Sequence, residues 1–300
     1  PAEGAQLRQE PCDMRPPPLV VPGRARRWWA SPSFLVGLIL AGLVVAAALI
    51  SYVCTPYDPK QMAILKRLRP PSAEHWFGTD QFGRDIFSMI MVGARNSLAV
   101  GLGAVGLGLT VGSALGLLAA MRRDGLLDNL IMRMADFSHA FPAVLSAIMI
   151  SAVWGPGMMN AVIAIAIYSL PYFARLARGA ALQCWALDYV LAARAAGLRE
   201  ITITRLHILP NIAGVLVVQA TIQFALAILA EAGLSYLGLG TQPPNPSWGR
   251  MLNEAQTFMA AQPWLAIFPG MAIALSVLAF NLLGDGLRDA VDPRTRRSRD

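Results

Sequence analysis

The segment DYVLAARAAGLREITITRLHILPN occupies residues 188–211, between two long apolar stretches. It is too polar for lipid, whereas the stretches before and after it are too apolar for water. Its alanines and arginines suggest a shaped loop that docks onto a partner outside the membrane. The alternative is a plain connector whose arginines only hold it on the cytoplasmic side, but a connector can be far shorter.

The composition is that of an integral membrane protein. Of the 300 residues, 55% are hydrophobic and 14% are charged, and the mean hydropathy is +0.50, whereas soluble domains contain about 25% charged residues. Windows without charged residues run over Phe34–Val53, Asn96–Met121, Phe137–Ala174, Leu206–Ala230 and Ala255–Gly284. A spanning helix needs roughly 20 residues, and the third window is about twice that length. Trp154-Gly155-Pro156-Gly157 interrupts it, which predicts a helical hairpin and six spans in total.

The placement of Lys and Arg orients the chain. With the N-terminus in the cytoplasm, 18 of the 25 Lys and Arg lie on the cytoplasmic side, which is the positive-inside bias, and six spans put both termini there. This placement explains the net charge of +7 without nucleic acid. The spans are expected near residues 34–53, 95–120, 129–153, 158–177, 211–234 and 264–285.

The same pattern divides the chain into segments. We expect a disordered cytoplasmic tail (1–30), a first transmembrane helix (31–54) and a periplasmic segment (55–93). A transmembrane core (94–286) follows, containing the polar loop 178–210 and a periplasmic loop 236–263. Residues 287–300 are expected to form a cytoplasmic tail.

A glycine motif in the second span favours helix packing over nucleotide binding. Residues 101–106, Gly-Leu-Gly-Ala-Val-Gly, match the dinucleotide fingerprint, but they lie within a charge-free span and no strand precedes them. Gly108, Gly112 and Gly116 continue at four-residue spacing, which lets helix backbones approach closely in lipid. We therefore expect these glycines to lie at a helix–helix contact.

The sequence shows no catalytic residue, no metal pattern and no cofactor site of its own. Its only lysines, Lys60 and Lys66, do not belong to a phosphate-binding loop. If the protein works with ATP, another chain must bind the ATP and magnesium. His75, His139 and His207 are scattered over loops and span boundaries, and they are expected to be polar boundary residues.

Two acidic residues lie near the ends of apolar windows. Asp136 is three residues from Arg133, so the two are expected to pair at the inner boundary. Glu231 lies some 20 residues past Pro210, about 30 Å along a helix, which places it at the outer face. The membrane interior is then almost free of titratable groups, which argues against a proton-coupled pump. An ion-gradient-driven secondary carrier remains an alternative, although the two halves show no inverted repeat.

The polar loop has local structure of its own. Trp185–Ala196 is rich in alanine and is predicted to form a short helix, and Gly197 follows as a helix C-cap or tight turn. Ile201–Thr204 is a β-branched run whose propensity favours a strand. Pro210 fits the first turn of the fifth span. A small-faced helix, a glycine turn and a second element would make a compact knob.

Five motifs together resemble one family. They are HWFGTDQFGRD (75–85), DYVLAARAAG (188–197), RLHILPN (205–211), LSYLGLGTQPPNPSWG (234–249) and AFNLLGDGLRDAVDPR (279–294). The loop is similar to the EAA loop of ABC importer permeases. The set resembles the second, C-type permease of dipeptide, oligopeptide and nickel importers, over about residues 32–294.

The resemblance implies an all-α type I importer fold, with five core helices after an extra first helix, in a bacterial inner membrane. It implies a non-enzymatic permease subunit that forms half of a translocation pathway for di- or oligopeptides, with nickel, glutathione or another small solute as alternatives. Implied partners are a homologous B-type permease, two cytoplasmic ATPases that carry ATP and magnesium, and a periplasmic or lipid-anchored binding protein.

The resemblance also assigns site residues. Coupling to the ATPase falls to Asp188, Leu191, Ala192, Ala193, Gly197, His207, Leu209 and Pro210. A periplasmic motif comprises Gly78, Thr79, Asp80, Gly83, Arg84, Asp85, Trp248 and Gly249. The chain departs from the family at Leu191, which takes the place of the motif glutamate, and at His207, which takes the place of an isoleucine. Asp188, one turn earlier, is a candidate substitute for the acid, but we expect packing to dominate the docking.

Overall fold

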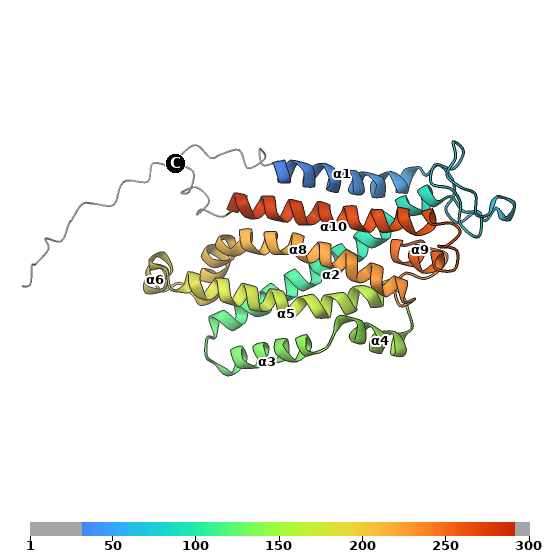
Figure 1. Cartoon of the computed structure of the whole chain (residues 1–300). Helices are drawn as coiled ribbons and strands as arrows, with labels where there is room; N and C mark the ends of the chain where they lie inside the picture. Colours follow the sequence, from blue (N-terminus) through green and yellow to red (C-terminus); the bar gives the residue numbers. More distant parts are fainter. Residues whose placement is uncertain (1–31, 292–300) are drawn as a thin grey trace, which may run out of the picture.

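The computed structural model describes residues 32–291, and that part of the chain is helical (Figure 1). Five helices are long and apolar enough to cross a membrane: α1 (Pro32–Val53), α2 (Ile86–Met121), α5 (Met158–Trp185), α8 (Leu209–Tyr236) and α10 (Trp264–Val291). Helices α3 (Leu126–Ala140) and α4 (Ala143–Trp154) form a bent pair with an angle of 89°. The predicted six spans are present when this pair counts as one broken span.

Short elements occupy the two ends of the bundle. One end, called here the loop end, carries α6 (Asp188–Ala195), α7 (Glu200–Ile203) and a π-helical turn (Thr204–Ile208). The opposite end, called the motif end, carries residues 54–85 and α9 (Trp248–Ala255), as Figure 1 shows. Among the described residues the one β-type pairing is an isolated bridge between Thr79 and Asp85.

The interior is built on the contact between α2 and α5, the most extensive helix pair, with α2 crossing the bundle obliquely (Figure 1). Glycines allow this close approach. A Cβ on Gly112 or Gly116 would overlap the carbonyl oxygen of Leu170 or Ala174 on α5, and one on Gly108 would overlap the Ser169 hydroxyl. The packing role expected for this glycine series is therefore confirmed.

Several predicted boundaries are wrong. Helix α2 begins at Ile86, well before residue 95, because the Asp85 carboxylate caps it by accepting a hydrogen bond from the Ser88 N–H at 2.8 Å. The last residues of the expected periplasmic segment 55–93 are thus helical. Helix α10 runs on to Val291, past the expected end of the core at 286. The expected tail 1–30, and the tail beyond Val291, lie outside the described residues.

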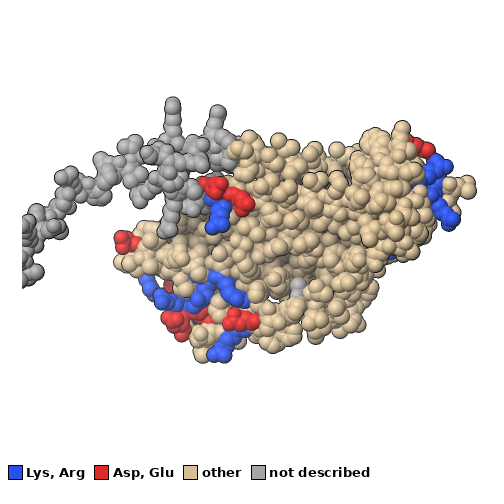
Figure 2. All heavy atoms as spheres, in the orientation of Figure 1, with Lys and Arg blue, Asp and Glu red and all other residues tan. Residues whose placement is uncertain are grey.

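The surface has the distribution that a membrane requires. Figure 2 shows acidic and basic side chains gathered toward the two ends of the molecule, with a broad uncharged belt between them. Leu43 on α1 and Leu102 on α2, both within helices long enough to cross a membrane, are 62% and 69% exposed. Apolar side chains exposed in this way on long helices are stable in a hydrocarbon core, since lipid tails are as apolar as leucine.

Candidate functional site

The polar loop folds into a compact knob that one buried side chain holds against the bundle. Val190 in α6 is fully buried among the side chains of the main core cluster, and Ala193 packs partly against the same cluster. The remaining side of α6, including Asp188, Leu191 and Ala192, is exposed. The predicted short helix is confirmed, with its start at Asp188 instead of Trp185.

Gly197 ends α6 in the conformation that only glycine adopts easily. Its φ is +82°, in the left-handed region. The N–H of Gly197 donates to the carbonyl of Arg194 at 3.0 Å, and the N–H of Leu198 donates to the carbonyl of Ala193 at 3.2 Å. These two hydrogen bonds form a Schellman motif, which satisfies the last carbonyls of α6. The predicted turn is confirmed, and open space surrounds the glycine.

The β-branched run Ile201–Thr204 is helical, so the strand favoured by its propensity is wrong. Tertiary packing overrides the propensity, because Ile203 and Ile208 are fully buried on one side of a continuous helical run into α8. The π-helical turn precedes Pro210, and the N–H of Leu209 bonds the carbonyl of Thr204. A proline cannot donate an N–H, and the wider turn leads into it at the second position of α8.

The tip of the knob offers an apolar exposed surface. Leu187, Leu191 and Leu198 are 43%, 49% and 41% exposed. Two of the nearby charges are paired with each other, since Arg194 donates to the Glu200 carboxylate at 3.1 Å. Asp188 has no side-chain partner among the described residues and lies in the first turn of α6, where a helix N-terminus stabilises an acid.

The structure brings only part of the predicted coupling set together. Asp188, Leu191 and Ala192 share the exposed side of α6, and Gly197 ends it. His207, Leu209 and Pro210 lie farther along the chain, at the root of the knob, where the helix continues into the bundle. There Asn211 donates to the Tyr189 hydroxyl at 2.9 Å, which ties α6 to the start of α8.

At the motif end, residues 75–85 form a tight structure that glycines make possible. Gly78 and Gly83 have φ values of +80° and +75°, and a Cβ on either would overlap the carbonyl oxygen of Arg69 or Ala63. The Thr79 hydroxyl accepts from the N–H of Arg69 at 2.9 Å and donates to the carbonyl of Lys66 at 2.5 Å. The predicted motif glycines thus shape the backbone of this segment.

Arg84 joins this segment to α9. Its Nε donates to the Asp80 carboxylate at 2.6 Å, and its Nη2 donates to the Glu254 carboxylate at 2.6 Å. Glu254 also accepts from Arg250 at 2.7 Å. Sequence reasoning missed Glu254 and Arg250, although their i,i+4 spacing of opposite charges was visible in the sequence.

Two buried acids define the electrostatics of this end. Burial raises the pKa of Asp80, and the charge and hydrogen bonds of Arg84 pull this pKa partly back. Asp85 accepts from Ser88 and lies 2.9 Å from the His75 ring nitrogen Nδ1. His75 is only 4% exposed, so it is an interior polar residue and not the boundary residue that we expected.

Trp248 and Gly249 begin α9 and seat it in the bundle. Trp248 is 1% exposed, and its indole N–H donates to the carbonyl of Ile90 in α2 at 3.1 Å. A Cβ on Gly249 would overlap the carbonyl oxygen of Ala232 in α8. Of the predicted motif residues, those from 78 to 85 and those at 248–249 are therefore joined through α2, α8 and the Arg84–Glu254 bridge.

Glu231 lies near the motif end of α8, but it is fully enclosed by protein and does not face the membrane boundary as expected. Ser97 of α2 and Ser235 of α8 each donate to its carboxylate at 2.7 Å. The distance along the helix was predictable from the sequence, and Ser235 lies one turn away on the same helix, whereas Ser97 comes from a distant segment and left no signal.

The predicted pairing of Asp136 with Arg133 is wrong in its partner. Asp136 lies 3.8 Å from Arg175 of α5, and no pairing with Arg133 is found among the described residues. Arg175 belongs to a neighbouring helix and reaches across to the end of α3, where it also donates to the carbonyl of Ala135 at 3.4 Å. Among residues 32–291, no three His, Cys, Asp or Glu side chains lie close enough together to hold a metal ion.

Comparison with known proteins agrees with this arrangement. The family described as "Binding-protein-dependent transport system inner membrane component" matches residues 112–297. The chain belongs to that family. It therefore lies in a bacterial inner membrane and is a permease component of an ABC importer, and the predicted family and localisation are confirmed.

Relatives cover nearly the whole chain. It is 48% identical over 255 residues to the glutathione transport system permease protein of Pectobacterium atrosepticum, covering 85% of this chain and 84% of the relative. It is 45% identical over 262 residues to the dipeptide transport system permease protein of Alkalihalophilus pseudofirmus, covering 87% and 86%.

A solved structure supports the fold. A chain from an inward-facing form of the MetNI methionine ABC transporter matches with a TM-score of 0.58 and 18% identity, covering 68% of this chain and 96% of that one. The type I permease fold, predicted from the sequence, is confirmed by this match together with the family match.

Proposed function

We propose that this permease forms half of the translocation pathway for di- or oligopeptides and is driven by ATPases that dock on the knob at its loop end. The observation that carries the proposal is the knob itself. It is anchored by Val190, turned by Gly197 and left apolar at its tip by Leu191 and its neighbours. An exposed apolar surface on a polar loop outside the membrane is typical of a protein–protein contact.

The proposed partners follow from the two ends of the bundle. The loop end would be cytoplasmic and would contact two ATPases, which bind the ATP and magnesium. The motif end would be periplasmic, where a periplasmic or lipid-anchored binding protein delivers the substrate. A homologous B-type permease would complete the passage. The excess of Lys and Arg on the cytoplasmic side of the predicted topology supports this orientation.

The peptide substrate is proposed from relatives. Their names assign dipeptide or glutathione transport to those proteins, and glutathione is itself a small peptide. Binding assays on the cognate solute-binding protein, co-purified with this chain, would decide the substrate. Tight binding of dipeptides or oligopeptides is expected, and selective binding of nickel or another non-peptide solute would reject the peptide proposal.

The coupling proposal is tested at Gly197. Gly197→Val is expected to insert into the membrane normally but to abolish uptake and substrate-stimulated ATPase activity, because a β-branched residue does not adopt a φ of +82°. Gly197→Asn is the matched control, since asparagine tolerates this conformation and the site has open space. Normal uptake by the valine variant would reject the role of the turn in coupling.

A further inference from the structure

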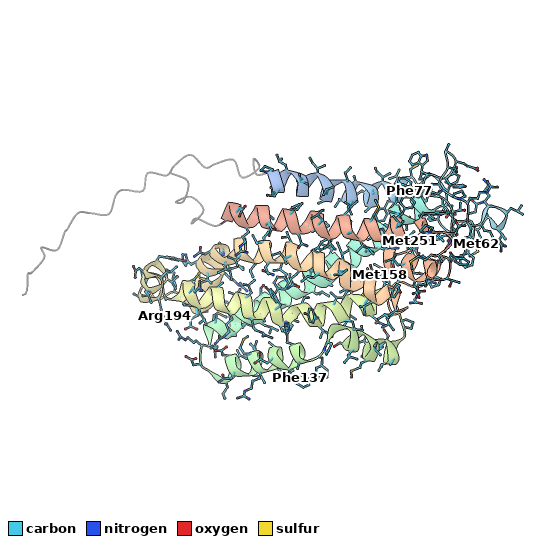
Figure 3. The ribbon with its side chains drawn as sticks, in the orientation of Figure 1. Met62, Phe77, Phe137, Met158, Arg194 and Met251 are labelled. Carbon is cyan, nitrogen blue, oxygen red and sulfur yellow. The ribbon has the colours of Figure 1, made fainter. Side chains whose placement is uncertain are left out.

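Helix α3 has two exposed sides of opposite character. Leu130, Met134 and Phe137 form an apolar side and are 60%, 56% and 61% exposed. Figure 3 shows Phe137 on the side of α3 that faces away from the bundle. Asn129, Arg133 and Asp136 form a second exposed side at the same i, i+4, i+7 spacing. The third side of the helix, which includes Ile131 and Ala135, is buried.

Helix α5 adds a polar stripe beside the polar side of α3. Tyr168, Tyr172 and Arg175 follow each other at helical spacing, and none of them is buried. Arg175 lies 3.8 Å from Asp136, and the ring of Tyr168 stacks on His139 with centroids 5.4 Å apart. We call this set the polar seam: Asn129, Arg133, Asp136 and His139 of α3, with Tyr168, Tyr172 and Arg175 of α5.

The polar seam lies beside the break between α3 and α4. Phe141 and Pro142 interrupt the helix, and the chain turns by 89°. Backbone groups at two helix ends therefore lose their helical partners at this depth. The Tyr168 ring, which stacks on His139 close to the break, is ten residues into α5, about 15 Å from the start of that helix. The break therefore lies well inside the span. Non-helical backbone at membrane depth is tolerated where it is buried in protein or lines a water-filled cavity.

We propose that the polar seam lines the translocation passage, while the apolar side of α3 faces lipid. Charged side chains within spans face a water-filled cavity or the interior of an assembly, not hydrocarbon. The Asp136 and Arg175 side chains remain 69% and 43% exposed even though they form a pair. This exposure leaves room for both to contact additional charged groups in the passage.

The chemistry of the seam fits a peptide with free termini. Asp136 offers a carboxylate to the terminal ammonium, and Arg175 offers a guanidinium to the terminal carboxylate. The exposed ring of Tyr168 and the half-buried ring of Tyr172 offer apolar surface for side chains without selecting one sequence. This assignment rests on the proposed peptide transport, whereas the lining of the passage does not depend on the substrate.

The lining is tested by cysteine labelling in everted vesicles that contain the complete transporter. The background chain has Cys12, Cys54 and Cys184 replaced by alanine. Single cysteines replace Arg133, Asp136 and Tyr168 in the seam, and the matched controls are Leu130→Cys, Met134→Cys and Phe137→Cys on the same helix. The probe is a membrane-impermeant, positively charged thiosulfonate.

Seam positions are expected to react at least tenfold faster than the controls. Equal rates on both sides of α3 would overturn the proposal. Unreactive cysteines at every seam position would also overturn it, because lipid or a partner subunit would then cover the seam. The accumulation of each variant in the membrane is measured first, so that reactivity is compared only among assembled transporters.

The substrate contact is tested separately by uptake of alanyl-alanine into proteoliposomes of the complete transporter. Asp136→Asn and Arg175→Gln are each expected to lower uptake severalfold while ATPase stimulation by the loaded binding protein stays close to wild type. The control is Arg123→Gln, which removes another exposed pair, with Asp124 at 3.3 Å. Wild-type uptake by both seam variants would overturn the contact.

The two experiments separate the possible failures. If the cognate binding protein binds no peptide, the proposed peptide function fails while fast labelling of the seam still supports the lining of the passage. If the seam does not react although peptides are transported, the proposed function stands and the assignment of the lining fails.

Discussion

In the proposed coupling motif Leu191 takes the place of a glutamate, and its side chain is 49% exposed at the tip of the knob. Burying a leucine side chain stabilises a contact by about 1.5–3 kcal/mol. Because about half of the Leu191 side chain is already covered, docking can gain about 0.7–1.5 kcal/mol from it, and Leu191→Ser is expected to weaken ATPase docking roughly three- to tenfold. Asp188→Asn serves as the control and should have little effect. Co-purification of the ATPase and the rate of uptake measure both variants.

The same argument gives a salt dependence. Contacts held by packing are insensitive to ionic strength, whereas exposed ion pairs weaken as salt screens them. Docking of the ATPase is expected to change little between about 0.1 and 0.5 M salt. A steep loss of docking over this range, together with a strong effect of Asp188→Asn, would show that Asp188 replaces the missing acid.

Arg84 links the segment 75–85 to α9 at the motif end. Its side chain is 9% exposed and bridges Asp80 and Glu254. Removing one partner of a buried ion pair costs about 3–5 kcal/mol. Arg84→Gln is expected to lower the melting temperature of the purified protein by several degrees. Arg69→Gln is the control, because Arg69 is 48% exposed and lies 3.6 Å from Glu74.

The loss in Arg84→Gln should depend on pH. Burial already raises the pKa of Asp80, and without Arg84 that pKa rises further. An acid with a raised folded pKa destabilises the fold in full above that pKa, and the destabilisation is lost as pH falls from the folded pKa to the lower unfolded pKa. The difference in stability between Arg84→Gln and wild type should therefore shrink on acidification. A difference that grows as pH falls would contradict this assignment.

At the scale of elements, the contact between α2 and α5 depends on missing side chains. Gly116→Ala places a methyl group against the carbonyl oxygen of Ala174, and such overpacking costs about 1–3 kcal/mol. A lower melting temperature in detergent is expected. The control is Gly106→Ala on the same helix, where nothing lies within 4 Å. Equal melting temperatures for the two variants would contradict the packing argument.

The elements that sequence reasoning predicted best are those that lipid alone specifies. Apolar length placed α1 and α10 nearly where they lie, because spanning a membrane constrains length and composition together. Boundaries failed where a specific contact decides them, as when Asp85 caps α2 at Ile86. The strand favoured for Ile201–Thr204 failed because the buried side chain of Ile203 fixes a helix there.

Of the two candidate sites, the knob was easier to predict from the sequence than the contacts of the motif end. The Gly197 turn was visible because one residue type at one position carries its own conformational signal. The contacts of Arg84 with Glu254, of Asp136 with Arg175 and of Glu231 with Ser97 were not visible, since each joins segments that are distant in sequence. Contacts of this kind follow from the packing of helices, which a single sequence specifies only indirectly.

At the scale of the whole molecule, an ABC permease and an ion-driven carrier differ in the energy source that transport requires. The chain reconstituted alone, with a sodium or proton gradient, is expected to show no uptake. The assembly with its ATPases, partner permease and binding protein is expected to transport when ATP is supplied. Gradient-driven uptake by the isolated chain, measured with labelled dipeptide, would support the secondary-carrier alternative instead.

The unbroken helical run from Glu200 to Tyr236 connects the knob with the serine-bound Glu231 near its far end. With 37 residues it is about 55 Å long. Such a rod works as a lever whose far end is clamped by hydrogen bonds. The helix from Glu231 back to Glu200 spans about 47 Å, so a tilt of about 5° at the clamp would carry the knob end through roughly 4 Å. A small rotation of this helix would therefore produce a displacement of several ångströms at the surface on which the ATPase is proposed to dock.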